Sequence, residues 1–157
     1  MKTNYKELTR ELIKKELVII SPGATFFEAR EIIQDKGIGH LPVVDNYNNL
    51  VGLVTDRDIR EAGPSDATSL SNLEIKYLLV RLKVSSFMTP RDKLITINPD
   101  TPLEEAVQLM HDNKVGCLPV VENGKLFGIF TETDALSLLV DFLGRPPMLN
   151  ESLCGKM

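Results

Sequence analysis

The second half of the chain repeats the first, and this duplication constrains the fold more than any single residue does. Residues 22–46 align with residues 99–123 at an offset of 77, and residues 50–58 align with residues 126–134 at an offset of 76. Identical residues occupy 14 of the 34 aligned positions. A repeat of about 50 residues buries only a modest core by itself, so the two copies are expected to share one body with a pseudo-two-fold axis. Clefts between the copies should then occur in pairs.

The composition is that of an ordinary soluble globular protein, with 43% hydrophobic and 25% charged residues. The net charge of −4 argues against a nucleic-acid-binding surface, which requires a basic face. No segment approaches the ~20 apolar residues that cross a bilayer, and the N-terminal sequence lacks the apolar region of a signal peptide. Cys117 and Cys154 have neither CxxC nor CxxH spacing. We therefore expect a reduced, cytoplasmic protein that has no metal site and binds neither nucleic acid nor membranes.

Each copy shows the same order of predicted elements. A β-branched run, at residues 17–20 and again at 94–97, predicts a strand that ends near a proline. Helices with apolar spacing follow, and capping signals at Thr25 and Thr101 precede them. Leu-Pro-Val-Val then predicts a buried strand, and a polar turn with a further strand completes a hairpin. A last helix begins after each hairpin, so the pattern predicts an α+β fold of two β-α-β-β-α repeats.

Breaks in this pattern predict the domain boundaries, and two helices carry apolar residues beyond the repeat. The connecting helix has an apolar face that is predicted to pack on the body of the protein or on a second subunit, and this face comprises Leu70, Leu73, Tyr77 and either Leu78 or Val80. The last helix, residues 134–143, has more apolar residues than one buried face uses, which indicates a homodimer interface. The predicted boundaries are 1–16 for an N-terminal helical segment, 17–62 for repeat 1, 63–83 for the connecting helix, 84–143 for repeat 2 and 144–157 for a flexible tail.

One polar motif occurs in both copies at the start of the last helix. It reads Gly52-Leu-Val-Thr55-Asp-Arg-Asp58 in the first copy and Gly128-Ile-Phe-Thr131-Glu-Thr-Asp134 in the second. A helix N-terminus offers free N–H groups to a phosphate, and the aspartate can accept hydrogen bonds from two vicinal hydroxyls such as those of ribose. Thr-x-x-Asp is also an ordinary capping arrangement. Its occurrence twice, downstream of Gly-x-Leu-Pro-Val-Val, favours a ligand site.

With these motifs, the chain resembles a tandem pair of CBS domains, also called a Bateman module, over about residues 17–62 and 84–143. The stretch from Ser65 to Val84 is similar to the acetoin-utilisation-type branch. The resemblance implies that an adenosine-containing ligand, such as AMP, ADP, ATP or S-adenosylmethionine, binds between the repeats. The ribose would lie on the aspartate of one repeat and the base against the other. The motifs that carry the resemblance are Gly39-His-Leu-Pro-Val-Val44, Gly52–Asp58, Val84-Ser-Ser-Phe-Met-Thr-Pro90, Gly116–Val121 and Gly128–Asp134.

The resemblance implies two nucleotide-binding sites, of which the first is favoured. His40 stands where the family often has a basic residue for phosphate, whereas the second site has Cys117 there. Arg57 and Arg60 could add positive charge near the first site. The first site would comprise Thr55, Asp58 and His40 with Thr101, Ala106, Val115 and Gly116 from the second repeat. The second site would comprise Thr131, Asp134 and Cys117 with Ala24, Ala29, Ile38 and Gly39 from the first repeat.

Three classes of function compete for this sequence. The first is a regulatory module that binds an adenosine-containing ligand and signals by reorientation to an unknown regulated protein. An enzyme is disfavoured, because the chain has no P-loop, no HExxH and no nucleophile–base signature. The alternative is a ligand-free dimerisation module, in which the same motifs serve packing and capping alone. We expect a non-catalytic homodimer that needs no cofactor and takes an adenine nucleotide or S-adenosylmethionine as ligand.

Overall fold

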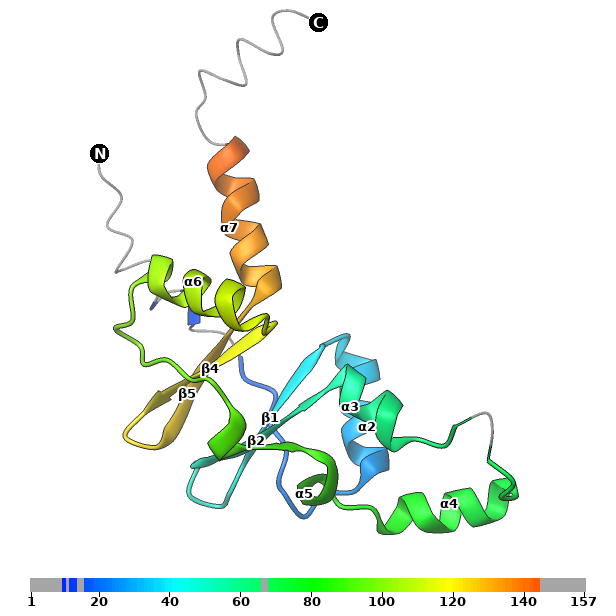
Figure 1. Ribbon diagram of the computed structural model, residues 1–157. Helices are drawn as coiled ribbons and strands as arrows, with labels where there is room; N and C mark the ends of the chain where they lie inside the picture. Colours follow the sequence, from blue (N-terminus) through cyan, green and yellow to red (C-terminus); the bar gives the residue numbers. More distant parts are fainter. Residues whose placement is uncertain (1–9, 11, 14–15, 66–67, 145–157) are drawn as a thin grey trace, which may run out of the picture.

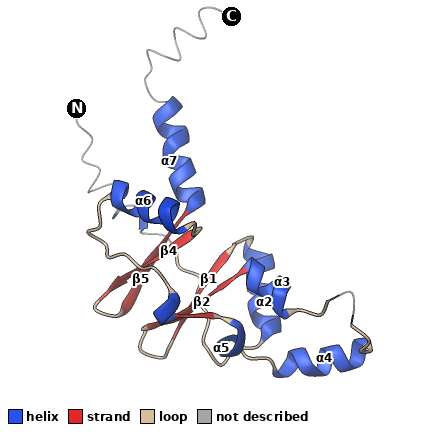
Figure 2. Cartoon of the chain, in the orientation of Figure 1, coloured by secondary structure: helices blue, strands red, loops and turns tan. Residues whose placement is uncertain are grey.

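The structure, a computed structural model, describes residues 10, 12–13, 16–65 and 68–144 (Figures 1 and 2). The α+β fold of two similar units is confirmed. Most of the predicted N-terminal segment and the predicted tail beyond Gly144 lie outside the described residues. The first unit contains α2 (Phe26–Lys36), β1 (His40–Val44), β2 (Leu50–Thr55) and α3 (Asp56–Ala62). The second contains α6 (Leu103–Asn113), β4 (Cys117–Glu122), β5 (Lys125–Thr131) and α7 (Glu132–Gly144). Between them lie α4 (Asn72–Arg81), α5 (Val84–Phe87), β3 (Thr89–Pro90) and the 3-10 helix η1 (Arg91–Lys93).

The first predicted strand of each unit is reduced to a single parallel bridge, from Ile20 to Val43 and from Ile97 to Val120. The N–H of Ile20 donates to the carbonyl of Pro42, and the N–H of Val44 donates to the carbonyl of Ile20, both at 3.0 Å. The pairing cannot extend through Pro22, because proline has no N–H to donate. These segments therefore contribute one residue each to the sheets rather than a full strand.

The two units are joined through their hairpins. Asn49 and Lys125 form an antiparallel bridge. The N–H of Leu126 donates to the carbonyl of Asn48 at 3.0 Å, and the N–H of Leu50 donates to the carbonyl of Gly124 at 3.3 Å. The side chains of Leu50 and Leu126 are buried together in a small apolar cluster beneath these bonds. The shared body that the duplication predicts is therefore held by both hydrogen bonds and apolar contacts.

The core of each unit is completed by the segment that precedes the other unit. Val84, Phe87 and Met88 lead into the second unit, but they pack in the core of the first. The same segment supplies β3, which pairs antiparallel with β2. Ile13, ahead of the first unit, lies instead in the core of the second. The two units are thus interlocked, because neither core is complete without a stretch of chain that leads to its neighbour.

Side-chain capping explains where α2 begins but not where α6 begins. Thr25 forms a full capping box with Glu28, whose carboxylate accepts the Thr25 N–H at 2.7 Å, as predicted. The corresponding prediction at Thr101 was wrong. The Thr101 hydroxyl accepts the N–H of Asn98 at 3.1 Å, and α6 starts after Pro102 without a side-chain cap. Because Pro102 takes the cap position, the threonine lies one residue too early to cap the helix.

The connecting helix α4 packs on the first unit through a face other than the predicted one. Leu79 is buried and Ile75 is half-buried against the core that α2 covers. The predicted face is exposed instead, with 78% of Leu73 accessible to solvent. Ile75 and Leu79 are four residues apart and define one helix face, and the predicted stripe lies on the other side. The exposed residues of that stripe are Leu70, Leu73, Tyr77, Leu78 and Val80.

Helix α7 carries an apolar surface that the described part of the chain does not cover. Figure 1 shows it leaving the end of β5 and projecting away from the two hairpins. Of its residues only Asp134 is buried, and Ala135 and Leu138 touch the core. Within the described residues, no helix combines the length and apolar character needed to cross a bilayer. The exposed apolar residues of α7 are Leu136, Leu139, Val140, Phe142 and Leu143.

Candidate functional site

Thr55 and Asp58 form a capping box at the junction between β2 and α3. The Thr55 N–H and hydroxyl both donate to Oδ2 of Asp58, at 2.7 Å and 2.8 Å, and the Asp58 N–H donates to the Thr55 hydroxyl at 3.1 Å. Asp58 is half-buried. Its other carboxylate oxygen, Oδ1, accepts no hydrogen bond from the residues that the structure describes. Capping thus occupies one oxygen of this carboxylate and leaves the second for another donor.

His40 lies where the two units meet, at the first residue of β1. A Cβ atom placed on Gly116 would be 3.3 Å from Nε2 of His40 and 3.5 Å from Oε2 of Glu132. The charges of both Glu132 and Asp58 act on the imidazole. His40 is therefore bordered by a carboxylate from its own unit and by a glycine and a carboxylate from the other. Of the predicted first site, the structure brings Thr55, Asp58, His40 and Gly116 together.

The pKa of His40 predicts a stability loss in mild acid. Burial lowers this pKa below its ordinary value of 6.5, and the carboxylates of Glu132 and Asp58 oppose the shift only in part. The folded state then binds fewer protons than the unfolded state as the pH falls below 6.5. The free energy of unfolding should decrease over that range and be fully restored above it. Urea titrations at about pH 7.5, 6.5 and 5.5 measure this, and His40→Gln should remove the decrease. If the free energy of unfolding of His40→Gln decreased with falling pH as much as that of the unaltered chain, the role of His40 would be contradicted.

The predicted members of the first site from the second unit are less accessible than those from the first. Ala106 is completely buried in the core of its unit, and Thr101 is nearly so. Val115 is half-buried and packs against that same core. Gly116 is half-buried beside His40. Ala106 and Thr101 are therefore shielded from solvent, and Val115 and Gly116 are the more accessible residues of this predicted set. Their contact with a ligand stays a prediction.

The second predicted site repeats the hydrogen bonds of the first but is more enclosed. The N–H and hydroxyl of Thr131 donate to Oδ2 of Asp134, both at 2.9 Å. Asp134 is only 6% exposed, and Cys117 is buried, which raises the pKa of its thiol to about 12. Across the interface Ala29 is completely buried, Ala24 and Ile38 are half-buried and Gly39 is exposed. The deeper burial of Asp134 agrees with the preference for the first site.

The two arginines near the first site are engaged elsewhere. Arg57 forms an ion pair with Glu61 at 2.9 Å, and Arg60 forms one with Asp56 at 3.3 Å. Both pairs are exposed and join residues four apart on α3, so water screens them strongly. The positive charge that the sequence suggested for this site is therefore largely balanced within the helix.

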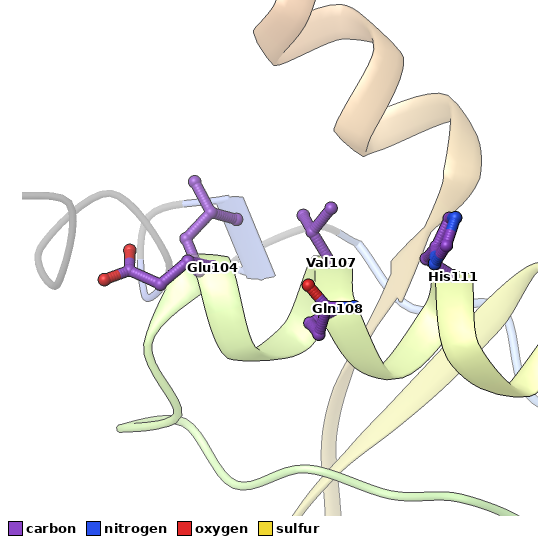
Figure 3. Close-up of a pocket in the computed structure, with 5 residues that line it drawn as sticks. Glu104, Val107, Gln108 and His111 are labelled. Atoms are coloured by element: carbon purple, nitrogen blue, oxygen red, sulfur yellow. The ribbon is translucent and has the colours of Figure 1, made fainter.

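One cavity of the described structure shares no lining residue with either predicted site. A shallow open cavity of about 600 Å³ covers the outer face of α6 and is lined by Leu103, Glu104, Val107, Gln108 and His111 (Figure 3). Its lining residues come from one helix, and none belongs to either predicted site. The described residues hold no group of three or more His, Cys, Asp or Glu side chains that could bind one metal ion.

Glu132 is the residue at this interface that sequence reasoning missed. It is the first residue of α7, and its N–H donates to the carbonyl of Gly116 at 3.0 Å. The equivalent residue in the first repeat is Asp56, whose N–H donates to the carbonyl of Gly39 at 3.1 Å. The alignment of Glu132 with Asp56 in the repeat was the sequence signal for this residue, because each of the two acids lies beside one of the predicted glycines, Gly116 or Gly39.

Comparison with known proteins agrees with this architecture. The family model for the CBS domain matches twice, over residues 9–65 and 84–141. A CBS domain-containing protein of Dictyostelium discoideum is 38% identical over 143 residues, which cover 90% of this chain and 97% of that protein. Inosine-5′-monophosphate dehydrogenase of Methanocaldococcus jannaschii is 34% identical over 80% of this chain, but the match spans only 22% of the enzyme. The chain belongs to the CBS-domain family and contains a tandem pair of these domains.

Solved structures show the same fold. The acetoin utilization protein AcuB from Vibrio cholerae superposes with a TM-score of 0.70 at 24% identity, over 87% of this chain and 92% of that one. CBSX2 in complex with AMP gives a TM-score of 0.69 at 28% identity, over 85% and 96% of the two chains. The CBS domain pair of MJ0100, in complex with 5′-methylthioadenosine and S-adenosyl-L-methionine, gives 0.67 at 25% identity, over 83% and 98%. Solved proteins with this fold therefore include binders of adenosine-containing ligands.

Proposed function

We propose that this protein is a non-catalytic regulatory module that binds an adenosine-containing ligand at the first site, between its two CBS domains. Asp58 carries the proposal, because its half-buried carboxylate uses one oxygen for capping and keeps the other for a ligand. Two vicinal ribose hydroxyls suit such an acceptor. The ligands named for CBSX2 and the MJ0100 pair support the same class of ligand here.

Isothermal titration with AMP, ATP, S-adenosylmethionine and 5′-methylthioadenosine tests the proposal. Asp58→Asn is the informative variant. Its amide oxygen can still accept the hydrogen bonds from the N–H and hydroxyl of Thr55, but its amide nitrogen cannot accept a hydrogen bond from a ribose hydroxyl. We expect its affinity for the preferred ligand to fall about 10- to 100-fold, since hydrogen bonds to a charged group contribute about 1.5–3 kcal/mol. An unchanged melting temperature without ligand would show that the fold is intact.

The matched control is Asp134→Asn, which changes the same motif in the more enclosed second site. We expect its effect on affinity to be smaller than that of Asp58→Asn. A larger loss in Asp134→Asn would reverse the order of the sites. Equal affinity of Asp58→Asn and the unaltered protein for every bound ligand would contradict the role of Asp58.

The second candidate is a ligand-free dimerisation module, and one observation favours it. Both aspartates already cap their helices, so their presence has a purely structural explanation. A thermal-shift experiment with the four ligands separates the two functions, because a ligand that binds only the folded state raises the apparent melting temperature. A rise with at least one of them supports the regulatory module, and no rise with any of them supports the ligand-free module.

The proposed signal is a change in the relative orientation of the two units, which a ligand bound between them would favour by its differential affinity. Two exposed apolar surfaces are available to transmit it. One is the stripe on α4 and the other is the surface of α7, for which we propose a homodimer contact. The regulated partner would be a separate protein in the cytoplasm that contacts one of these helices.

A further inference from the structure

An acidic side chain faces the proposed ligand site from the opposite unit. Gly116 lacks a Cβ atom, and a methyl group there would lie 3.3–3.5 Å from the side chains of both His40 and Glu132. The imidazole and the carboxylate therefore flank the same point of the interface. A ligand whose ribose rests on Asp58 and whose remainder reaches His40 would meet the field of Glu132 as well.

The charge of Glu132 is not balanced by a neighbouring cation. Its repeat equivalent, Asp56, has Arg60 four residues later on α3 and forms an ion pair with it at 3.3 Å. The residue four positions after Glu132 is Leu136, so α7 supplies no such partner. Across the part of the chain that the structure describes, no lysine or arginine forms an ion pair with Glu132. The two repeats thus share an acidic residue at this position but differ four residues later, where the first has Arg60 and the second has Leu136.

The remaining groups at the site do not reverse this balance. Arg57 is paired with Glu61, and burial favours the neutral form of His40 at pH 7. Asp58 contributes a second negative charge beside the imidazole. Asp58 is half-buried and Glu132 is exposed, so water screens the charge of Glu132 in part. Two carboxylates and an uncharged imidazole still form a poor site for a triphosphate, because like charges repel.

We propose that Glu132 sets the ligand specificity of the first site, so that it takes an adenosine with a neutral or cationic 5′ substituent, a thioether or a sulfonium, in preference to a 5′-di- or triphosphate. This inference rests on the proposed function, since it concerns the same site. A sulfonium carrying an amino-acid ammonium group is attracted by the Glu132 carboxylate, a thioether is indifferent to it, and a polyphosphate is repelled. AMP, with one phosphate, falls between the thioether and the triphosphate.

Titration of four ligands into three proteins tests the inference. The ligands are 5′-methylthioadenosine, S-adenosylmethionine, AMP and ATP, and the proteins are the unaltered chain, Glu132→Gln and the control Glu31→Gln. Glu31 is an exposed acid on α2 outside both predicted sites. In the unaltered chain we expect the thioether and the sulfonium to bind severalfold more tightly than ATP. Glu132→Gln should tighten ATP about two- to fivefold, weaken S-adenosylmethionine by a similar factor and leave the thioether nearly unchanged, and Glu31→Gln should change none of them.

Two results overturn the inference while the proposed function stands. One is binding of ATP to the unaltered chain as tightly as the thioether, and the other is an equal change for all four ligands in Glu132→Gln. Failure of every adenosine compound to bind would instead contradict the proposed function itself. The melting temperature of Glu132→Gln without ligand should stay within a few degrees of the unaltered chain, which separates a charge effect from unfolding.

Discussion

Replacing Phe130 by alanine is expected to lower the free energy of unfolding by about 3–5 kcal/mol. Phe130 is completely buried on β5, opposite Leu118 of β4, in the core of the second unit. Removing its ring would leave a cavity in this core. Such a loss is a large share of the stability of a typical domain, which is about 5–15 kcal/mol. Urea denaturation followed by circular dichroism measures it.

The matched control is Phe142→Ala, because Phe142 is 65% exposed on α7. In the monomer this change should alter the free energy of unfolding by no more than about 0.5 kcal/mol. If α7 forms the proposed homodimer contact, light scattering should instead show a shift from dimer toward monomer. A cost below about 1 kcal/mol for Phe130→Ala would contradict its place in the core.

Replacing Gly52 by alanine is expected to cost about 1–3 kcal/mol, because the new methyl group has no space. A Cβ atom at Gly52 would lie 2.5 Å from the sulfur of Met88 and 2.8 Å from the carbonyl oxygen of Thr89. The methionine side chain can move, but the Thr89 carbonyl is held in the pairing of β3 with β2. The melting temperature should fall, and the segment from Val84 to Pro90 should become more sensitive to proteolysis.

Gly23→Ala is the control for this substitution, since nothing lies within 4 Å of a Cβ atom at Gly23. It should leave stability unchanged or raise it slightly by restricting the unfolded chain. If Gly52→Ala and Gly23→Ala had equal melting temperatures, the close packing of the Met88–Thr89 segment on the first unit would be contradicted.

Features that depend on neighbouring residues were predictable from the sequence. The capping boxes at Thr25 and Thr55 formed as predicted, because a side chain three residues away satisfies the free N–H groups. The hairpin turn at Asn123 and Gly124 has the two positive φ angles, 52° and 78°, that this residue pair favours. The wrong prediction at Thr101 also has a local cause, because Pro102 takes the cap position and α6 begins one residue later than predicted.

Predictions that depended on the partner surface were less successful. The face by which α4 packs on the first unit is not the predicted stripe, because the helix is apolar on two sides and the core of the first unit contacts Ile75 and Leu79. Packing of the stripe on a second subunit stays a prediction. For the first site, the pairing of Thr55 with Asp58 and the place of His40 beside Gly116 follow the prediction. The structure instead pairs Arg57 with Glu61 and Arg60 with Asp56 along α3, and their contribution to the site stays a prediction.

The sequence by itself determined the duplication, the order of elements in each repeat and the threonine–aspartate pairs, because all of these rest on residue spacing along the chain. Only the tertiary structure decided that the segments before each unit are exchanged and that Glu132 faces His40 across Gly116. The physical reason is that such contacts join residues far apart in sequence. Their formation depends on how two packed units fit together, and no local pattern records that fit.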